Sequence, residues 1–324
     1  MEKLFKLKEH GTDVKTEIIA GITTFLAMAY ILAVNPSYLG GIDGMSAGAV
    51  FSATAISAGI ATLCMAFFAN YPVALASGMG LNAFFAFTVC GAMGYSYKVA
   101  LTAVFIEGII FMLLSLFKFR EALVNKIPSN LKFAITAGIG LFIAIIALLN
   151  ANDVVASEST TVALGELSSP TVVLSLVGLL IIGALQHYKV PGGILLGILI
   201  TWVLGIIAQL VGWYVPNPEA GEYSVIPQFS LSSFEALKMF QFDFGFIAKN
   251  VPAFILIVFT FLYTDIFDTV GTLIGVAEKG KLLDKDGSLP NATGALMADA
   301  VGTVVGACLG TSTVTSYVES SAGV

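Results

Sequence analysis

The sequence predicts an all-α polytopic membrane protein, a chain of helices that crosses a membrane many times. Apolar residues make up 57% of its 324 residues, charged residues only 11%, and the mean hydropathy is +0.92. Soluble domains carry about 25% charged residues. Apolar runs close to the ~20 residues of one membrane helix recur along the whole chain. Five carboxylates nevertheless lie inside such runs: Glu107, Asp265, Asp268, Asp299 and Glu319. Because a carboxylate at membrane depth costs roughly 2.5–3.5 kcal/mol, each is a candidate functional residue.

Ten segments are predicted to be membrane spans. In chain order they are residues 18–35, 49–68, 72–89, 100–117, 133–149, 172–185, 192–211, 251–276, 294–309 and 311–324. The first is too long for a removed signal peptide, and many spans follow it. Residues 231–246 mix phenylalanines with charged residues, which predicts an amphipathic helix at the membrane surface before the eighth span.

The lysine and arginine residues predict the orientation of the chain. With a cytoplasmic N-terminus, twelve of the fifteen fall on the cytoplasmic side, and only Lys98, Lys238 and Lys249 on the other side. Basic residues near span ends concentrate in the cytoplasm. We therefore expect a multi-pass protein of the plasma (inner) membrane with its N-terminus inside.

Two of the ten spans are predicted to be broken. Residues 71–86 contain Pro72, Gly78 and Gly80, and residues 310–324 open with Gly310 and a run of threonine and serine. Each predicts a short extended piece followed by a half-helix, whose free N–H groups can meet a ligand. As the third and tenth spans, they stand seven apart, which predicts two inverted seven-span repeats. On this expectation the chain ends inside the second repeat, without spans eleven to fourteen, and is not expected to transport.

The candidate site residues cluster around these breaks. Asp265 and Asp268 share one helix face at a spacing of three, Glu319 follows the hydroxyl-rich run, and Asn82 lies in the first half-helix. Carboxylates accept ring N–H groups, an amide serves donors and acceptors, and Phe84, Phe85 or Tyr317 could supply a stacking ring. For each polar residue the alternative is a buried hydrogen bond that ties two helices together; Asp265, Asp299 and Glu107 are expected in such supporting or proton-relay roles.

The ligand expected from these residues is planar, neutral and able to form hydrogen bonds. No arginine lies in any predicted span, which disfavours an anion. Cys64, Cys90 and Cys308 are isolated, without the spacing of a metal site. We expect no cofactor other than a coupling proton, which a membrane carboxylate can carry.

Four segments carry a resemblance to a known family. They are GITTFLAMAYILAVNP (21–36), GMGLNAFFA (78–86), TDIFDTVGT (264–272) and GTSTVTSYVES (310–320). In this order they closely resemble the adenine/guanine/hypoxanthine permeases of the AzgA-like branch of the nucleobase–cation symporters. The resemblance implies proton-coupled import of purine nucleobases, not an enzyme. A homodimer is one assembly open to such a protein, and nucleic acid is not an expected partner.

The same resemblance implies a core domain and a gate domain. Residues 1–127 would contribute core spans one to four, residues 128–230 gate spans five to seven, and residues 231–324 the core part of the second repeat. The purine would bind between the broken spans and span eight, at Asp268, Glu319, Asn82 and Gly80, with Asp299 in support.

Two other functions were considered. An intramembrane aspartyl protease also needs two membrane acids, but its Gly-x-Gly-Asp signature does not occur here. An anion transporter of the same fold would not be expected to place Glu319 at the start of a half-helix.

Overall fold

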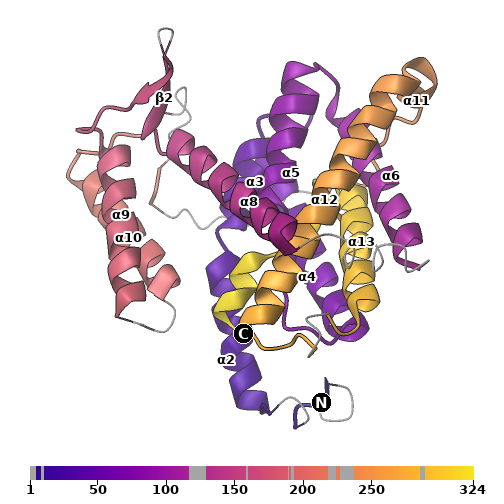
Figure 1. The fold of residues 1–324 in the computed structure, drawn as a ribbon. Coiled ribbons are helices and arrows are strands. Elements are labelled where there is room, and N and C mark those ends of the chain that lie inside the picture. Colours follow the sequence, from indigo (N-terminus) through magenta and orange to yellow (C-terminus); the bar gives the residue numbers. More distant parts are fainter. Residues whose placement is uncertain are drawn as a thin grey trace. The chain divides into compact units, whose positions relative to one another are not determined.

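The structure is a computed structural model that describes residues 5–8, 11–116, 129–157, 160–188, 190, 193–217, 224–226, 237–284 and 289–324. This part of the chain is helical apart from four short strands (Figure 1). Six of its helices are long and apolar enough to cross a membrane. The predicted fold class, a helical protein of many spans, is confirmed.

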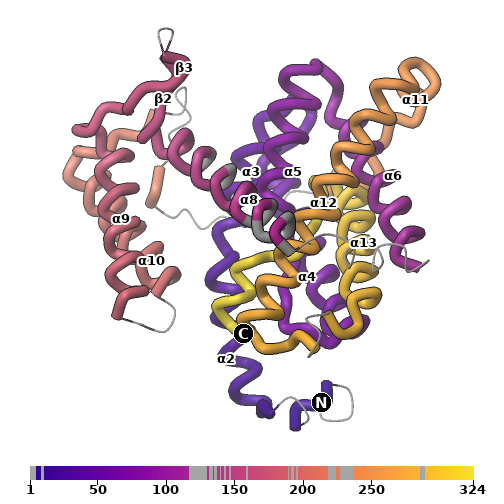
Figure 2. The backbone as a smooth tube through the Cα atoms, viewed as in Figure 1, coloured from indigo at the N-terminus to yellow at the C-terminus, as the bar shows by residue number. Residues whose placement is uncertain are grey.

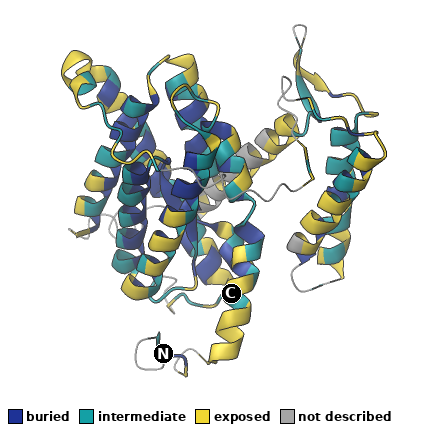
Figure 3. Cartoon of the chain, turned by 180° about the vertical axis from the view of Figure 1, so that it is seen from behind, coloured by how far each residue is buried: buried dark blue, intermediate teal, exposed yellow. Residues whose placement is uncertain are grey.

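The chain forms two compact units. One comprises residues 1–139 and 232–324, and the other residues 140–231. The buried residues of the first unit gather along the inward sides of its helices, and the helices α9 (Pro170–His187) and α10 (Gly193–Leu210) of the second are largely exposed or half-buried (Figure 3). The assignment of a core and a gate to residues 1–127, 128–230 and 231–324 stays a prediction.

Span one is interrupted near its middle. Helix α2 (Val14–Met28) and helix α3 (Ile31–Leu39) are separated by Ala29 and Tyr30. There the hydrogen bonds tighten to a spacing of three, since the Ala33 N–H donates to the Tyr30 oxygen at 3.0 Å. At its start, Asp13 caps α2 by accepting from the Thr16 N–H at 2.8 Å, a bond that lowers the pKa of Asp13.

Small residues let the central helices of the first unit approach closely. Helix α13 (Ala292–Leu309) packs against α4 (Ala47–Phe68) and α6 (Tyr97–Leu116). A Cβ atom added at Gly302 would lie 2.7 Å from the Cβ of Ala61, and one at Gly108 would lie 3.0 Å from Thr303 Cγ2. Such contacts between small residues are a common basis of helix association in membranes.

Helix α12 (Val251–Lys279) is the predicted eighth span and also packs on α6. Asn250 caps its start by accepting from the Ala253 N–H.

The amphipathic helix predicted at residues 231–246 is wrong over its described part, because residues 237–244 are not helical and α11 spans Gly245–Lys249. Phe240 adopts a left-handed conformation there, its N–H donates to the Cys308 oxygen, and the Asp243 side chain accepts from the Phe246 N–H. Residues 231–236 of that prediction lie outside the described residues.

The second unit contains the later part of α8 (Ser129–Asn150), a hairpin of β2 (Val154–Ser157) and β3 (Thr161–Leu164), and helices α9 (Pro170–His187) and α10 (Gly193–Leu210). Glycines bring α9 and α10 together, because Gly178 lies against Thr201 and Gly197 against Ile182. The hairpin was not predicted.

Both predicted breaks are confirmed. Span three consists of β1 (Leu75–Ser77), α5 (Met79–Ala83) and a π-helix, η1 (Phe84–Ala92). Span ten begins with β4 (Val314–Ser316) and a 3₁₀ turn, η4 (Val318–Ala322). Figure 2 shows this last, yellow segment beside the indigo helix α2, with which η4 is in contact.

Candidate functional site

The two broken spans meet through their strands. β1 and β4 pair antiparallel, with Leu75 opposite Ser316 and Ser77 opposite Val314, and all six strand residues are buried. Two main-chain bonds extend the ladder: the Gly78 N–H donates to the Thr313 oxygen and the Tyr317 N–H to the Ala74 oxygen, both at 3.0 Å. Extended backbone is tolerated at membrane depth only where protein satisfies its polar groups.

Side chains from the neighbouring helices satisfy the outer edges of this two-stranded sheet. Thr62 of α4 accepts from the Leu75 N–H at 3.0 Å, and Thr303 of α13 donates to the Val314 oxygen at 2.9 Å. Asp299 of α13 accepts from both the N–H and the hydroxyl of Ser316, at 2.9 and 3.0 Å. These polar residues therefore fix the two strands between the helices.

Asp299 also reaches α12. Its second oxygen accepts from the Thr269 hydroxyl at 2.9 Å, and Thr269 lies 3.0 Å from the hydroxyl of Thr315. Because Asp299 is fully buried and bonded to β4 and α12, the structure places it behind the strands. The supporting role predicted for it at a substrate site stays a prediction.

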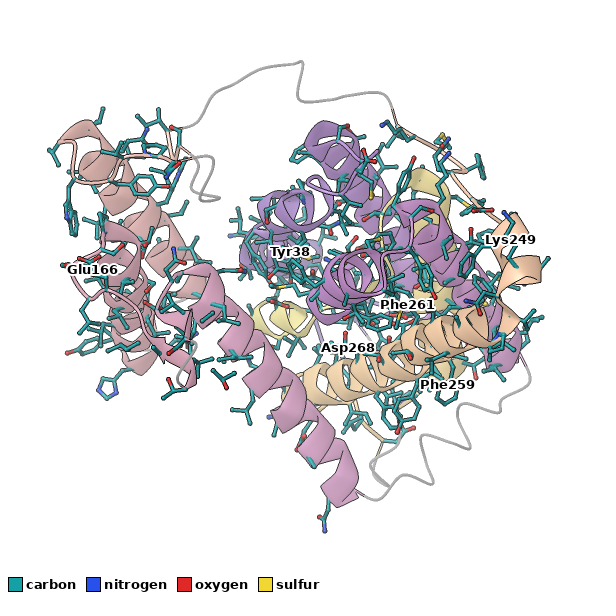
Figure 4. The ribbon with its side chains drawn as sticks, turned by 90° about the horizontal axis from the view of Figure 1, so that it is seen from above. Tyr38, Glu166, Lys249, Phe259, Phe261 and Asp268 are labelled. Carbon is teal, nitrogen blue, oxygen red and sulfur yellow. The ribbon has the colours of Figure 1, made fainter. Side chains whose placement is uncertain are left out.

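Asp268 lies on α12, seven residues beyond Phe261, as labelled in Figure 4. It is half-buried, and its charge interacts with those of Asp299 and Glu319. A Cβ atom added at Gly78 would lie 3.7 Å from Asp268 Oδ2. The carboxylate of Asp268 therefore lies beside the start of the half-helix of span three, where main-chain N–H groups are unused by the helix.

Glu319 lies at the equivalent start in span ten, within the 3₁₀ turn η4. It is half-buried, and its Oε1 accepts a 2.5 Å hydrogen bond from the hydroxyl of Tyr30 in span one. The structure thus brings Asp268 and Glu319 together as predicted and adds Tyr30.

Asn82 is more deeply buried than Asp268 and Glu319. It is fully buried, and its Oδ1 accepts from the Ser312 hydroxyl, which joins the half-helix of span three to span ten. Among the described residues its Nδ2 has no hydrogen-bond partner, which leaves both N–H groups of the amide available.

The predicted stacking rings differ in access. Tyr317 is 5% exposed, packs with Met28 and Ile31, and donates its hydroxyl to the Ser77 oxygen at 2.6 Å. Phe84 is half-buried and lies edge-on to Phe261, with ring centroids 4.9 Å apart, whereas Phe85 is fully buried. Phe84 is thus the more accessible ring in this conformation.

The remaining predicted residues lie around the two carboxylates or further away. Gly80, in α5, is half-buried. Asp265 is fully buried and accepts from Thr269 at 3.4 Å. Glu107 is fully buried on α6, next to Gly108 at the contact with α13.

Several polar residues at this centre were not predicted. Asn35 donates to Thr54 and Thr311 at 2.7 and 2.8 Å, and Thr311 in turn lies 2.9 Å from the Ser77 hydroxyl. Each is a polar residue in an apolar or broken span, which is the signal that could have identified it. Tyr30 lacked such a signal, because a tyrosine is common near membrane surfaces.

The polar centre does not coincide with two sizeable cavities in the described residues. One, of about 520 Å³, is almost wholly apolar and lies between α2, α3, α4 and residues 72–75; the other, of about 470 Å³, lies in the second unit. Neither contains Asp268, Glu319 or Asn82. We place the site by its polar side chains, because hydrogen-bonding groups determine specificity in a membrane site.

No group of three or more His, Cys, Asp or Glu side chains arranged for a metal occurs in the part of the chain that is described.

Comparisons with known proteins agree with this architecture. Adenine permease AdeQ of Escherichia coli is 42% identical over 327 residues, covering 100% of this chain and 70% of the relative. Guanine/hypoxanthine permease PbuO of Bacillus subtilis is 44% identical over 326 residues, covering 99% and 72%. The transmembrane domain of the cyanobacterial bicarbonate transporter BicA superposes with a TM-score of 0.65 at 14% identity, over 96% of this chain and 76% of that one, and therefore shares the fold.

Sequence and structure lead to the same assignment. Residues 15–324 match the family described as "Permease family" (Xan_ur_permease). The match covers nearly the whole chain, including both broken spans and all the carboxylates described above. The chain therefore belongs to this permease family.

Proposed function

We propose that the protein carries purine nucleobases, namely adenine, guanine or hypoxanthine, into the cell across the plasma membrane, coupled to protons. The relatives named adenine permease and guanine/hypoxanthine permease support this substrate class. The lysine and arginine distribution supports a cytoplasmic N-terminus.

The observation that carries the proposal is the pair of half-buried carboxylates: Asp268 of α12 lies beside the start of the half-helix of span three, and Glu319 lies in the 3₁₀ turn of span ten. A purine base is planar and neutral, and its ring N–H groups donate hydrogen bonds. An ionised carboxylate accepts such bonds more strongly than a neutral group does. The half-buried ring of Phe84 could stack on the base, and Asn82 and Gly80 of the same half-helix could complete the site.

The same carboxylates disfavour an anionic substrate. The bicarbonate transporter domain supports only the shared fold, because it is 14% identical. Two carboxylates whose charges already interact would repel an anion from the place where it would meet the half-helices. A neutral nucleobase has no such barrier.

The position of Glu319 supports proton coupling. A carboxylate inside a membrane protein can move a proton across when it alternates between its charged and neutral forms. In this proposal the core part, which contains spans one to four and eight to ten, moves against the gate part with the base and proton bound. The base is released chemically unchanged, so the protein is not an enzyme.

The test is uptake by the full-length protein in a bacterial strain without its own purine transporters. Labelled hypoxanthine, guanine and adenine should accumulate unchanged, compete with one another, and cease to accumulate when a protonophore abolishes the proton gradient. Uptake of none of the three bases would contradict the substrate class, and accumulation that survives the protonophore would contradict proton coupling.

The variant Glu319→Gln tests whether Glu319 carries the coupled proton. The glutamine keeps the shape of the side chain but cannot change charge, so uptake by the variant should depend much less on external pH than uptake by the wild type. An unchanged pH profile in a correctly inserted Glu319→Gln variant would remove Glu319 from this role.

A further inference from the structure

Tyr30 is a residue of span one that reaches one of the two carboxylates, Glu319. Its hydroxyl donates to Glu319 Oε1 at 2.5 Å, across 289 residues of sequence. Glu319 and Tyr30 both interact electrostatically with Tyr317, and Glu319 also with Asp268. Tyr30 is therefore part of the polar centre, although it lies in a mostly apolar span.

The interruption of span one places this hydroxyl. Tyr30 stands between α2 and α3, where the main-chain bonds tighten to a spacing of three. Tyr30 packs against a buried cluster that includes Met28 and Tyr317, as do Val34, Ala58 and Met79. A ring packed against a buried cluster has few orientations open to its hydroxyl, which suits a positioning role.

The two carboxylate oxygens of Glu319 differ in their hydrogen bonding. Oε1 is taken by Tyr30, whereas Oε2 accepts no hydrogen bond from the described residues. Glu319 is half-buried, and its Oε2, although it has no partner among these residues, is not a buried atom. The accessible oxygen is therefore the one that can meet a ligand.

We propose that Tyr30 is a positioning residue for the substrate: it holds Glu319 so that a single carboxylate oxygen accepts the imidazole N–H of the purine. This inference rests on the proposed function. The phenolic hydroxyl stabilises the carboxylate without adding a positive charge, so the site stays selective for neutral bases.

The chemistry of the three bases selects the imidazole N–H. Hypoxanthine and guanine carry an N1–H on the six-membered ring, and adenine does not. The imidazole N–H is the ring donor common to all three, and one carboxylate oxygen is sufficient to accept it. A carboxylate with both oxygens turned to the ligand would instead match the adjacent N1–H and amino group of guanine.

The test compares the full-length wild type with Tyr30→Phe and a matched control, Tyr71→Phe. Both variants lose one tyrosine hydroxyl that is bonded across the fold, but the partner of Tyr71 is the main-chain oxygen of Pro290. The measurements are the maximal uptake rate and the inhibition constants of adenine, guanine and hypoxanthine, in cells matched for inserted protein.

In Tyr30→Phe the inhibition constant of every base that the wild type accepts should rise about tenfold or more, because a hydrogen bond to a charged group is lost. The factor should be the same within about twofold for all bases, and the maximal rate should stay within about twofold. Tyr71→Phe should leave the constants unchanged. If Tyr30→Phe inserts poorly, binding of labelled base to membranes, normalised to inserted protein, gives the same comparison.

Three results would overturn the inference: unchanged constants in Tyr30→Phe, a lower maximal rate alone, or a loss confined to the bases with an N1–H. The first two would make the contact structural, and the third would assign Glu319 to another edge of the base. A wild type that takes up no purine would instead contradict the proposed function, and the two failures are thereby distinguished.

Discussion

The hydroxyl of Tyr317 in span ten donates a 2.6 Å hydrogen bond to the main-chain oxygen of Ser77 in span three. This bond adds to the antiparallel pairing of β1 and β4 and lies at the junction of each strand with its half-helix. The two broken spans are therefore tied together at the level of the carboxylates. We infer that they keep their mutual position when the core part moves against the gate part.

Tyr317→Phe should destabilise the protein without removing the ring from its cluster. The substitution leaves the Ser77 oxygen without its side-chain donor, which costs about 1–3 kcal/mol for a buried polar group. Thermal unfolding of the purified protein should show a lower midpoint. Tyr188→Phe, at a ring that is 77% exposed, should not change it. Equal midpoints for Tyr317→Phe and the wild type would mean that the bond does not hold the spans.

Asp299→Ala should be more harmful than Asp299→Asn. Alanine removes the acceptors of the Ser316 N–H and of two hydroxyls, those of Ser316 and Thr269, and each buried donor left unsatisfied costs about 1–3 kcal/mol. Asparagine keeps one acceptor for Ser316, and the Thr269 hydroxyl can turn to accept a hydrogen bond from the new amide N–H. Thermal unfolding measures both variants, and an alanine variant as stable as the asparagine variant would contradict this account of β4.

Two glycine-to-alanine substitutions should have opposite effects. At Gly302 the new Cβ atom would lie 2.7 Å from Ala61 Cβ, so overpacking should cost about 1–3 kcal/mol. At Gly275, on α12, nothing lies within 4 Å of the new atom, so alanine should be neutral or stabilising by about 0.5–1 kcal/mol. The unfolding midpoints decide the matter, and similar midpoints for the two variants would show that α13 does not pack closely on α4.

Asn82→Ala separates two possible roles of Asn82: donating a hydrogen bond to the base and tying Ser312 to span three. If its free Nδ2 donates to the base, the Michaelis constant for uptake should rise about tenfold, as for the loss of one well-placed hydrogen bond, with normal insertion. A lower unfolding midpoint with an unchanged Michaelis constant would show that Asn82 only ties Ser312 to span three.

Much of the fold was predictable because hydrophobicity determines it. The apolar runs predicted the six helices that are long and apolar enough to cross a membrane, and Pro72, Gly78 and Gly310 predicted the two extended segments. The pairing of β1 with β4 was not predicted, because strands of three residues give too short a pattern to indicate a partner 240 residues away. The helix predicted at residues 231–246 was wrong over its described part because local bonds to Asp243 and Cys308 outweighed the amphipathic pattern.

The candidate site was predictable only in part, for a physical reason. Carboxylates at membrane depth are costly and therefore visible in a sequence, so Asp268 and Glu319 could be paired in advance. Tyr30 and Ser77 carry no such cost and blend into apolar or small-residue segments. Their roles depend on which atoms meet across the fold, and the structure is needed to show that.

Uptake of labelled hypoxanthine by full-length Asp268→Asn tests the central claim most directly. The substitution keeps the size of the side chain and replaces one carboxylate oxygen with a donor, so uptake should fall at least about 100-fold at wild-type insertion. Asp243→Asn, which changes a carboxylate that caps α11, should transport normally. Wild-type uptake by a correctly inserted Asp268→Asn variant would contradict the assignment of the nucleobase site.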